Sequence, residues 1–262
     1  MNTDVNIGKV TINANAAPVT DAEQAQGVSL DDKTALELSA YSNVVSKDYQ
    51  YIGSGAAIEA AYIDNSNVAT STTNITISDN AKLNAGDVAA VDVKGGKIVI
   101  SASNEADMYS KTYVDVWGAV NYAGSNNDVT FNSIAKTNVA GDLETANGNI
   151  LITSGRDVEG NISDMHLTAE SDILNGSIIP ISTYPKPSAA VNSETFLDLA
   201  NTANVLSDGN VYLQSNAGIA DVSGVATGSQ LMHTVTTVIT GLSMGITVYV
   251  GQKIGERKEE KA

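Results

Sequence analysis

One short pattern recurs along the chain and constrains its fold more than any other feature. It reads glycine, polar, apolar, any, apolar, any, then alanine or serine, and full copies occupy residues 8–14, 96–102, 148–154 and 209–215. Because successive side chains of a β-strand point to opposite faces, each copy sends two apolar residues and one small residue to the same side. Each copy therefore predicts a short strand with one buried face.

The pattern extends beyond these full copies. An apolar residue often follows the small residue after four positions, as Val158 follows Ser154 and Ile219 follows Ser215. This spacing predicts a strand, a polar corner and a second strand that turns inward again. Looser copies without the glycine lie at residues 35–40, 74–78, 128–133 and 164–169.

The spacing of the copies predicts how the strands assemble. Copies begin at intervals of about 15 to 40 residues, which suggests coils of roughly 20 to 25 residues. A unit that short cannot bury its own apolar face, so it has to stack on its neighbours at about 4.8 Å. We therefore expect an all-β parallel β-helix, a β-solenoid of about ten coils and of the order of 50 Å long. A β-sandwich, which also has short alternating strands, is the alternative fold.

The extended pattern at residues 148–158 and 209–219 resembles the haemagglutinin-type repeats of filamentous haemagglutinins and leukotoxin-like filamentous adhesins. The likeness runs through most of residues 5–225. The resemblance implies a right-handed β-helix, export by a type V or two-partner route, and a role in cell adhesion and virulence as a rod that displays loops. It also implies an extracellular or bacterial cell-surface location. Residues 1–30 lack a secretory signal, so we expect an internal segment of a larger exported protein.

The organisation along the chain follows from the repeats and their interruptions. We expect solenoid repeats over residues 1–230, with loop excursions near 16–30, 109–127 and 175–190. An extra alternating strand over residues 113–122 is the alternative to a loop there. The last of the three excursions holds three of the four prolines, which cannot donate hydrogen bonds to a sheet. Residues 231–262 are expected to form terminal strands and a charged tail, because threonines and glycines interrupt the apolar run there.

The charge of the chain limits its partners. The formal net charge is -16 and the isoelectric point is near 4.3, whereas phosphate recognition needs clustered lysine and arginine. We expect no nucleic-acid partner and no membrane insertion. The chain contains no cysteine, so it has neither a disulfide nor a thiolate metal site, and we expect no cofactor and no bound metal.

A β-helix polysaccharide lyase or hydrolase is the alternative function. Asp31–Asp32 resembles the paired carboxylates of pectin-cleaving hydrolases, but the companion Gly-His-Gly and Arg-Ile-Lys elements do not occur. Arg156–Asp157 follows a strand and is more simply a corner contact. His166 is expected to face outward, and His233 has no partner nearby in sequence. These residues do not predict an enzyme.

Aromatic residues are the candidates for binding. Tyrosine and tryptophan combine an apolar ring with a polar group, which favours them at interfaces. Several are expected to be exposed, and the cluster between residues 109 and 122 is the strongest candidate for contact with a host-surface protein or glycan. The candidate binding residues are Tyr109, Tyr113, Trp117 and Tyr122; other expected exposed tyrosines are Tyr41, Tyr49, Tyr51 and Tyr184.

The predicted solenoid also has open ends. Strands at the first and last coils have unpaired backbone groups on one side, which can template pairing with another chain. The sequence therefore predicts end-to-end self-association.

Overall fold

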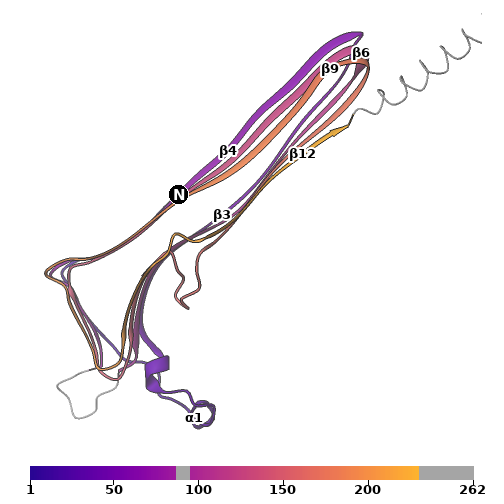
Figure 1. Cartoon of the computed structure of the whole chain (residues 1–262). Helices are drawn as coiled ribbons and strands as arrows, with labels where there is room; N and C mark the ends of the chain where they lie inside the picture. The colour runs from indigo at the N-terminus through magenta and orange to yellow at the C-terminus, as the bar shows by residue number, and fades with distance from the viewer. Residues whose placement is uncertain (87–94, 230–262) are drawn as a thin grey trace, which may run out of the picture.

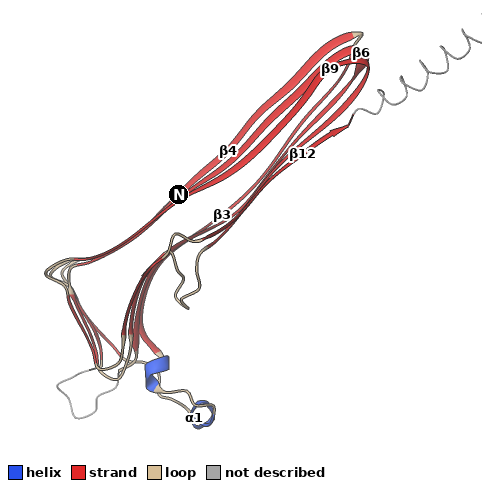
Figure 2. Ribbon diagram, viewed as in Figure 1, coloured by secondary structure: helices blue, strands red, loops and turns tan. Residues whose placement is uncertain are grey.

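The structure is a computed structural model that describes residues 1–86 and 95–229, and nearly all of these residues lie in β-strands (Figures 1 and 2). The prediction of an all-β chain is confirmed. The two helical elements are α1 (Asp21–Ala25) and the 3-10 helix η1 (Leu30–Asp32). The strands are β1 (Asn2–Ile7), β2 (Thr11–Ala14), β3 (Thr34–Gly55), β4 (Ile58–Ile77), β5 (Lys82–Ala85), β6 (Lys97–Val139), β7 (Asp142–Thr145), β8 (Ile150–Ser154), β9 (Asp164–Leu199), β10 (Asn204–Ser207), β11 (Val211–Ser215) and β12 (Ile219–Ser229).

All the strand pairings in the described part of the chain are parallel. The antiparallel contact found there is an isolated bridge between Arg156 and Ile162, outside the named strands. Each strand pairs with a segment that follows one circuit later in the sequence, so the chain returns in the same direction each time. Because a β-sandwich is built of antiparallel sheets, these strands do not form the alternative fold.

The coil is much longer than the sequence spacing predicted. Thr11 of β2 pairs with Lys82, Lys82 with Asp142, and Asp142 with Asn204, which places one whole circuit of the chain between each pair. Side-chain contacts between successive coils show the same separations in sequence, which are 71 residues from Asn13 to Asn84, 60 from Asn132 to Asn192 and 62 from Ala140 to Thr202.

The shorter coil expected from the sequence was wrong because the repeated pattern marks walls of the coil, and several walls make one circuit. Residues 36, 98, 150 and 211 stack on one wall, whereas the copy at 8–14 contributes to a different sheet. The full copies at 96–102, 148–154 and 209–215 therefore lie one coil apart, whereas the looser copies at 74–78, 128–133 and 164–169 lie on other walls and make the intervals in sequence shorter than a coil.

The stack is correspondingly shallow. The smaller sheet has the order β10-β7-β5-β2, four strands deep. At about 4.8 Å between strands this is a stack of roughly 14 Å, so the predicted rod of about ten coils is also wrong. The described chain is broad in the plane of each coil and thin along the stacking direction.

Each coil consists of a closed base and a long narrow arm (Figure 1). β3 runs outward from the base to the tip of the arm, Ala56 and Ala57 form the turn, and β4 runs back. β6 and β9 pass around the tip without interruption. We call the two sides of the arm the outgoing wall (residues 41–55, 103–117, 164–176 and 219–229) and the returning wall (58–71, 120–133 and 179–193).

The base contains the largest apolar core. Its strands meet around fully buried isoleucine, leucine and valine side chains. The glycine of the repeated pattern is required by a close backbone contact at the corner of the base. A Cβ at Gly148 would lie 2.1 Å from the carbonyl oxygen of Gly96 in the preceding coil. Only glycine allows backbones to stack that closely. The core includes Leu36, Ile75, Ile77, Leu83, Ile98, Ile100, Val139, Leu143, Ile150 and Ile152.

The arm has a different interior, in which apolar and polar layers alternate. Two apolar clusters lie along it, one around Phe131 and Met108 and one near the tip around Val114 and Val116. Buried hydroxyl and amide groups lie between them and toward the base, and they hydrogen-bond across the two walls. The inner belt comprises Ser42, Ser71, Asn104 and Ser133, and the outer belt comprises Asn65, Ser110, Thr112, Ser125, Asn127 and Ser171.

Two of the segments expected to leave the sheets are instead parts of the arm. Residues 109–127 lie within β6, which agrees with the alternative of a strand over 113–122, and residues 175–190 lie within β9 and do not form a loop. The prolines of the second segment are tolerated because, among the described residues, β12 pairs with β9 from Asp164 to Leu174 and no strand pairs with the later residues of β9 on that side. Residues 16–30 do leave the sheets, between β2 and β3, and contain α1 with a capping box of Thr20 and Glu23.

No helix in residues 1–86 or 95–229 is long and apolar enough to span a membrane. The terminal strands and tail expected over residues 231–262 lie outside the described residues, as does His233.

Candidate functional site

Three of the four candidate binding residues lie together on the outer face of the outgoing wall. Along β6, Tyr109, Tyr113 and Trp117 alternate with fully buried residues, so their side chains point away from the interior. Tyr122 follows the turn at the tip and points outward from the returning wall. The structure therefore divides the predicted cluster between two opposite faces of the arm.

Two tyrosines of the preceding coil complete the surface on the outgoing wall. Tyr51 is in register with Tyr113, and their rings stack 5.7 Å apart at an interplanar angle of 12°. Tyr49 contacts Tyr109 with ring centroids 5.5 Å apart. Tyr49 and Tyr51 are 66% and 68% exposed, so the rings form an open platform. We call Tyr49, Tyr51, Tyr109, Tyr113 and Trp117 the aromatic platform.

Tyr49 and Tyr51 are among the tyrosines that the sequence predicts to be exposed, but the sequence analysis does not group them with the cluster between residues 109 and 122. The separation in sequence between Tyr51 and Tyr113 equals the length of one circuit and could have indicated that they are neighbours. With the shorter coils expected from the sequence, this separation does not predict a contact. The error in coil length therefore concealed the composition of the platform.

Glycines beneath the rings let part of the platform lie flat on the wall. A Cβ at Gly176 would lie 2.3 Å from the Trp117 ring, and one at Gly53 would lie 2.2 Å from the Tyr51 hydroxyl oxygen. An aromatic ring that covers a glycine on a neighbouring strand shields the backbone there. The Trp117 indole N–H donates to Asp115 at 2.5 Å, which fixes the edge of this ring.

A charged group adjoins the platform. Lys111 Nζ lies 2.7 Å from carboxylate oxygens of both Glu170 and Asp172 on the next coil, and these contacts raise the pKa of the ammonium group. The Tyr109 hydroxyl donates to Glu170 at 2.5 Å. The lysine, and then the tyrosine, lower the pKa of Glu170. Partial burial, reinforced by the hydrogen bond to Glu170, raises the pKa of Tyr109 to about 12.

The electrostatics of the platform restrict what it can bind. The carboxylates of Asp115, Glu170 and Asp172 outnumber the two adjacent ammonium groups, those of Lys111 and of Lys47, which is in register with Tyr109. A hydroxyl-rich neutral ligand can stack on the rings and hydrogen-bond to these carboxylates, and a cationic group can contact the ring faces. An anionic ligand would meet like charge.

The returning wall carries a smaller aromatic group. Tyr122 lies 6.4 Å from Tyr184 between ring centroids, and Tyr62 lies over Gly124. These rings belong to three successive coils at nearly the same height on the arm. They provide a natural comparison for the platform on the outgoing wall.

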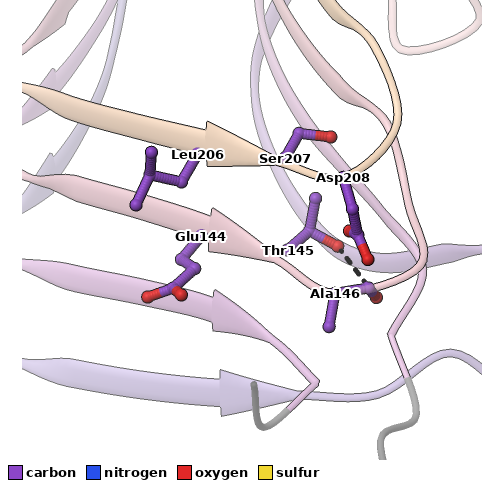
Figure 3. Close-up of a pocket in the computed structure, with 6 residues that line it drawn as sticks. All are labelled: Glu144, Thr145, Ala146, Leu206, Ser207 and Asp208. Carbon is purple, nitrogen blue, oxygen red and sulfur yellow. Dashed lines mark hydrogen bonds between the residues drawn. The ribbon is translucent and has the colours of Figure 1, made fainter. Parts of the chain in front are cut away.

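A separate hollow of about 210 Å³ lies at a corner of the base (Figure 3). Its polar groups stabilise the corner itself: Thr145 Oγ1 donates to the Gly96 carbonyl at 2.7 Å, and Asp208 accepts from the backbone N–H of Asn147 at 2.8 Å. Because these groups bond to neighbouring backbone, the hollow offers few side chains for chemistry. Its lining is Glu144, Thr145, Ala146, Leu206, Ser207 and Asp208.

The residues considered above for catalysis make hydrogen bonds and ion pairs with neighbouring groups of the fold. Asp32 accepts hydrogen bonds from the backbone N–H and hydroxyl of Ser29 at 2.8 and 3.0 Å. Arg156 donates to Asn216 on the next coil at 2.6 Å and to the Gly160 carbonyl at 2.5 Å. His166 points outward, as predicted, and lies 3.0 Å from Asp164. Within the described ranges, no group of three or more His, Cys, Asp or Glu side chains could hold a metal ion.

Comparison of the chain with protein-family models, curated proteins and solved structures finds no match. The function therefore has to be argued from the geometry of the arm and its platform.

Proposed function

We propose that this chain is a non-catalytic β-solenoid segment of a larger bacterial surface or secreted adhesin, whose arm presents the aromatic platform to a host-surface glycan or protein. The observation that carries the proposal is the stacked and exposed pair of Tyr51 and Tyr113, on a projecting wall held by parallel strands. The exposed rings thus lie on the part of the arm that projects away from the base, a few residues before its tip.

We further propose that the coils form a right-handed β-helix. Parallel strands joined by a crossover in the same sheet are right-handed in about 98% of cases, because strand twist favours that hand. Each circuit here joins parallel strands in this way. The same hand is what the resemblance to filamentous haemagglutinins implies.

The rigidity of the arm supports a role in display. Exposed aromatic side chains on a regular sheet lose little conformational entropy on binding, because the backbone is already fixed and each ring has only two side-chain torsions. Large apolar rings exposed in a group, next to polar residues, are typical of interaction surfaces. Such a platform suits contact with a saccharide or with a flat protein surface.

The experiment is a binding comparison on an array of mammalian cell-surface glycans and on cultured epithelial cells. The variant Tyr51→Ser/Tyr113→Ser is expected to lose at least about tenfold in apparent affinity, since central aromatic residues dominate binding energy at interfaces. Tyr122→Ser/Tyr184→Ser removes the same two side chains from the returning wall and should bind as the unmodified protein does. Equal binding by all three proteins would exclude the platform as the contact surface.

The same preparations also separate adhesion from catalysis. If the chain were a β-helix lyase or hydrolase, incubation with pectin-type polysaccharides would release new chain ends. Absence of host binding together with such release would replace the adhesin proposal by the enzymatic one.

A further inference from the structure

The two open ends of the arm differ from its interior in their inward-facing residues. Among the strands of residues 1–86 and 95–229, β3 pairs with β6 alone, and β4 has a second partner, β1, only over Thr72–Ile77. Residues 34–55 and 58–71 therefore form an open edge. None of the residues of β6 or β9 whose side chains face the interior of the arm is charged, whereas Asp48 and Glu59 of this edge coil both face inward.

Asp48 occupies a position that the next coils fill with small uncharged residues. It is in register with Ser110, which in turn is in register with Ala169. Its Oδ2 atom accepts a hydrogen bond from Asn65 Nδ2 at 2.6 Å, across the arm. A further coil stacked on β3 would cover this carboxylate and remove it from water. An ionised carboxylate without a cationic partner opposes such burial strongly.

Glu59 has the corresponding position near the tip of the returning wall. It is in register with Asn121, which is fully buried. One of its carboxylate oxygens, Oε2, is already buried and has no hydrogen-bond partner. Asp48 faces Asn65, Ser110 and Asn127, and Glu59 faces Asn121; no lysine, arginine or histidine of the described strands faces either carboxylate from inside the arm.

The opposite end of the arm lacks charges but has prolines. Just after the ends of β6 and β9, the backbone N–H groups of Ala140 and Ala200 donate to the preceding coil, each at 2.8 Å. Because successive residues of a parallel strand donate to opposite sides, the odd-numbered residues of β9 from 183 onward direct their backbone nitrogens to the following side, where none of the described strands pairs with them. Pro185 and Pro187 are among them, and neither can donate. Both are in register with residues that can, Ser125 and Asn127.

We propose that the arm is closed against end-to-end stacking of a second copy by these two devices, inward carboxylates at the β3–β4 edge and prolines at the β9 edge. Inward-pointing charges and edge prolines are ways in which natural sheets avoid edge-to-edge pairing. This proposal does not depend on the adhesive role.

The test replaces each closing residue by the one that the neighbouring coil has in the same register. The variant Asp48→Ser/Glu59→Asn/Pro185→Ser/Pro187→Asn is compared with the unmodified protein by sedimentation velocity at neutral pH over a hundredfold range of concentration. We expect a monomer for the unmodified protein and at least a tenfold lower concentration for association of the variant. The two paired variants, one for each end, should give intermediate behaviour.

A charge-matched control separates edge closure from general repulsion. Asp64→Asn/Asp128→Asn also removes two carboxylates, but from outward positions of the returning wall, and should remain monomeric. Association of this control to the same degree as Asp48→Ser/Glu59→Asn would overturn the role of the inward carboxylates. Concentration-dependent association of the unmodified protein at neutral pH would overturn the whole proposal, whether or not the variants fold. A folded fourfold variant that stays monomeric would overturn it too.

Discussion

The interiors of the base and of the arm are filled by different kinds of side chain. In the base, where three or more strand segments surround the interior, isoleucine and leucine fill the space. In the arm, two walls face each other, and hydroxyl and amide groups bridge them at intervals, as with Ser71 and Ser42 at 2.7 Å between oxygens. Burial of apolar area stabilises the base, whereas the arm depends more on satisfied buried hydrogen bonds. The two regions should therefore respond differently to substitution and to pH.

The largest effect is expected in the base. Ile152 is fully buried and stacks between Ile100 and Leu213 of the adjacent coils. Ile152→Ala should lower the free energy of unfolding by about 2–5 kcal/mol, because it removes buried methyl groups and leaves a cavity. Urea denaturation measures the change, and Val45→Ala, at an exposed position, is the control. A loss below about 1 kcal/mol would mean that the base is not the stability core.

A smaller and more local effect is expected in the arm. Asn127 accepts from Ser110 Oγ and Asn65 Nδ2 and donates to the carbonyls of Ser110 and Glu170. Asn127→Ala removes these four hydrogen bonds from the buried centre of the arm, while Asn65 keeps its bonds to Asp48 and Ser110, and we expect a cost of about 1–3 kcal/mol. Amide hydrogen exchange should show faster exchange in the arm with the base still protected. The control is Asn126→Ala, a substitution of the neighbouring residue that faces outward. Equally faster hydrogen exchange in the arm and in the base would contradict the distinction between the two regions.

The sequence predicted local structure better than it predicted long-range arrangement. Strands at residues 98–102 and 150–154 follow directly from alternation, and their glycines at 96 and 148 mark a backbone contact that local pattern can signal. The circuit length depends on how many walls separate two stacked copies, which alternation within one strand does not encode. The prolines at 185 and 187 were misinterpreted for the same reason, because only the position of a strand in the stack decides whether a missing N–H matters.

The candidate site shows the same limit. The sequence predicted one cluster between residues 109 and 122, but the chain turns at Gly118, so Tyr109, Tyr113 and Trp117 lie on the outgoing wall and Tyr122 lies on the returning wall. A turn with no break in the strand pattern leaves little trace in sequence.

Acidification should weaken the outgoing wall by a modest amount. The pKa of Glu170 lies below its ordinary value of 4.5, mainly because of Lys111. A carboxylate with a lowered pKa stabilises the fold above its ordinary pKa, and this contribution is lost as the pH falls from 4.5 to the lower value in the folded protein. The pair is partly exposed, so the loss should be about 0.5–1 kcal/mol. Glu170→Gln should lack this part of the pH dependence in urea denaturation, and an unchanged profile would contradict the assignment.

The smallest effect is spectroscopic and concerns a single hydroxyl of the platform. The pKa of Tyr109 is raised from 10.0 to about 12, first by partial burial and then by the hydrogen bond to Glu170. A raised pKa means that the neutral phenol stabilises the arm below pH 10, and that this contribution is lost as the pH rises toward 12. Ultraviolet titration should show tyrosines that ionise after the others, and Tyr109→Phe should remove one of them; Tyr41, whose pKa is raised by its hydrogen bond to Glu105, should still ionise late. In Glu170→Gln the contribution of Tyr109 should move toward 10 without reaching it, because burial persists. If the amplitude of the late component is the same in Tyr109→Phe as in the unmodified protein, other tyrosines carry it, and the contact between Tyr109 and Glu170 does not hold the platform as described.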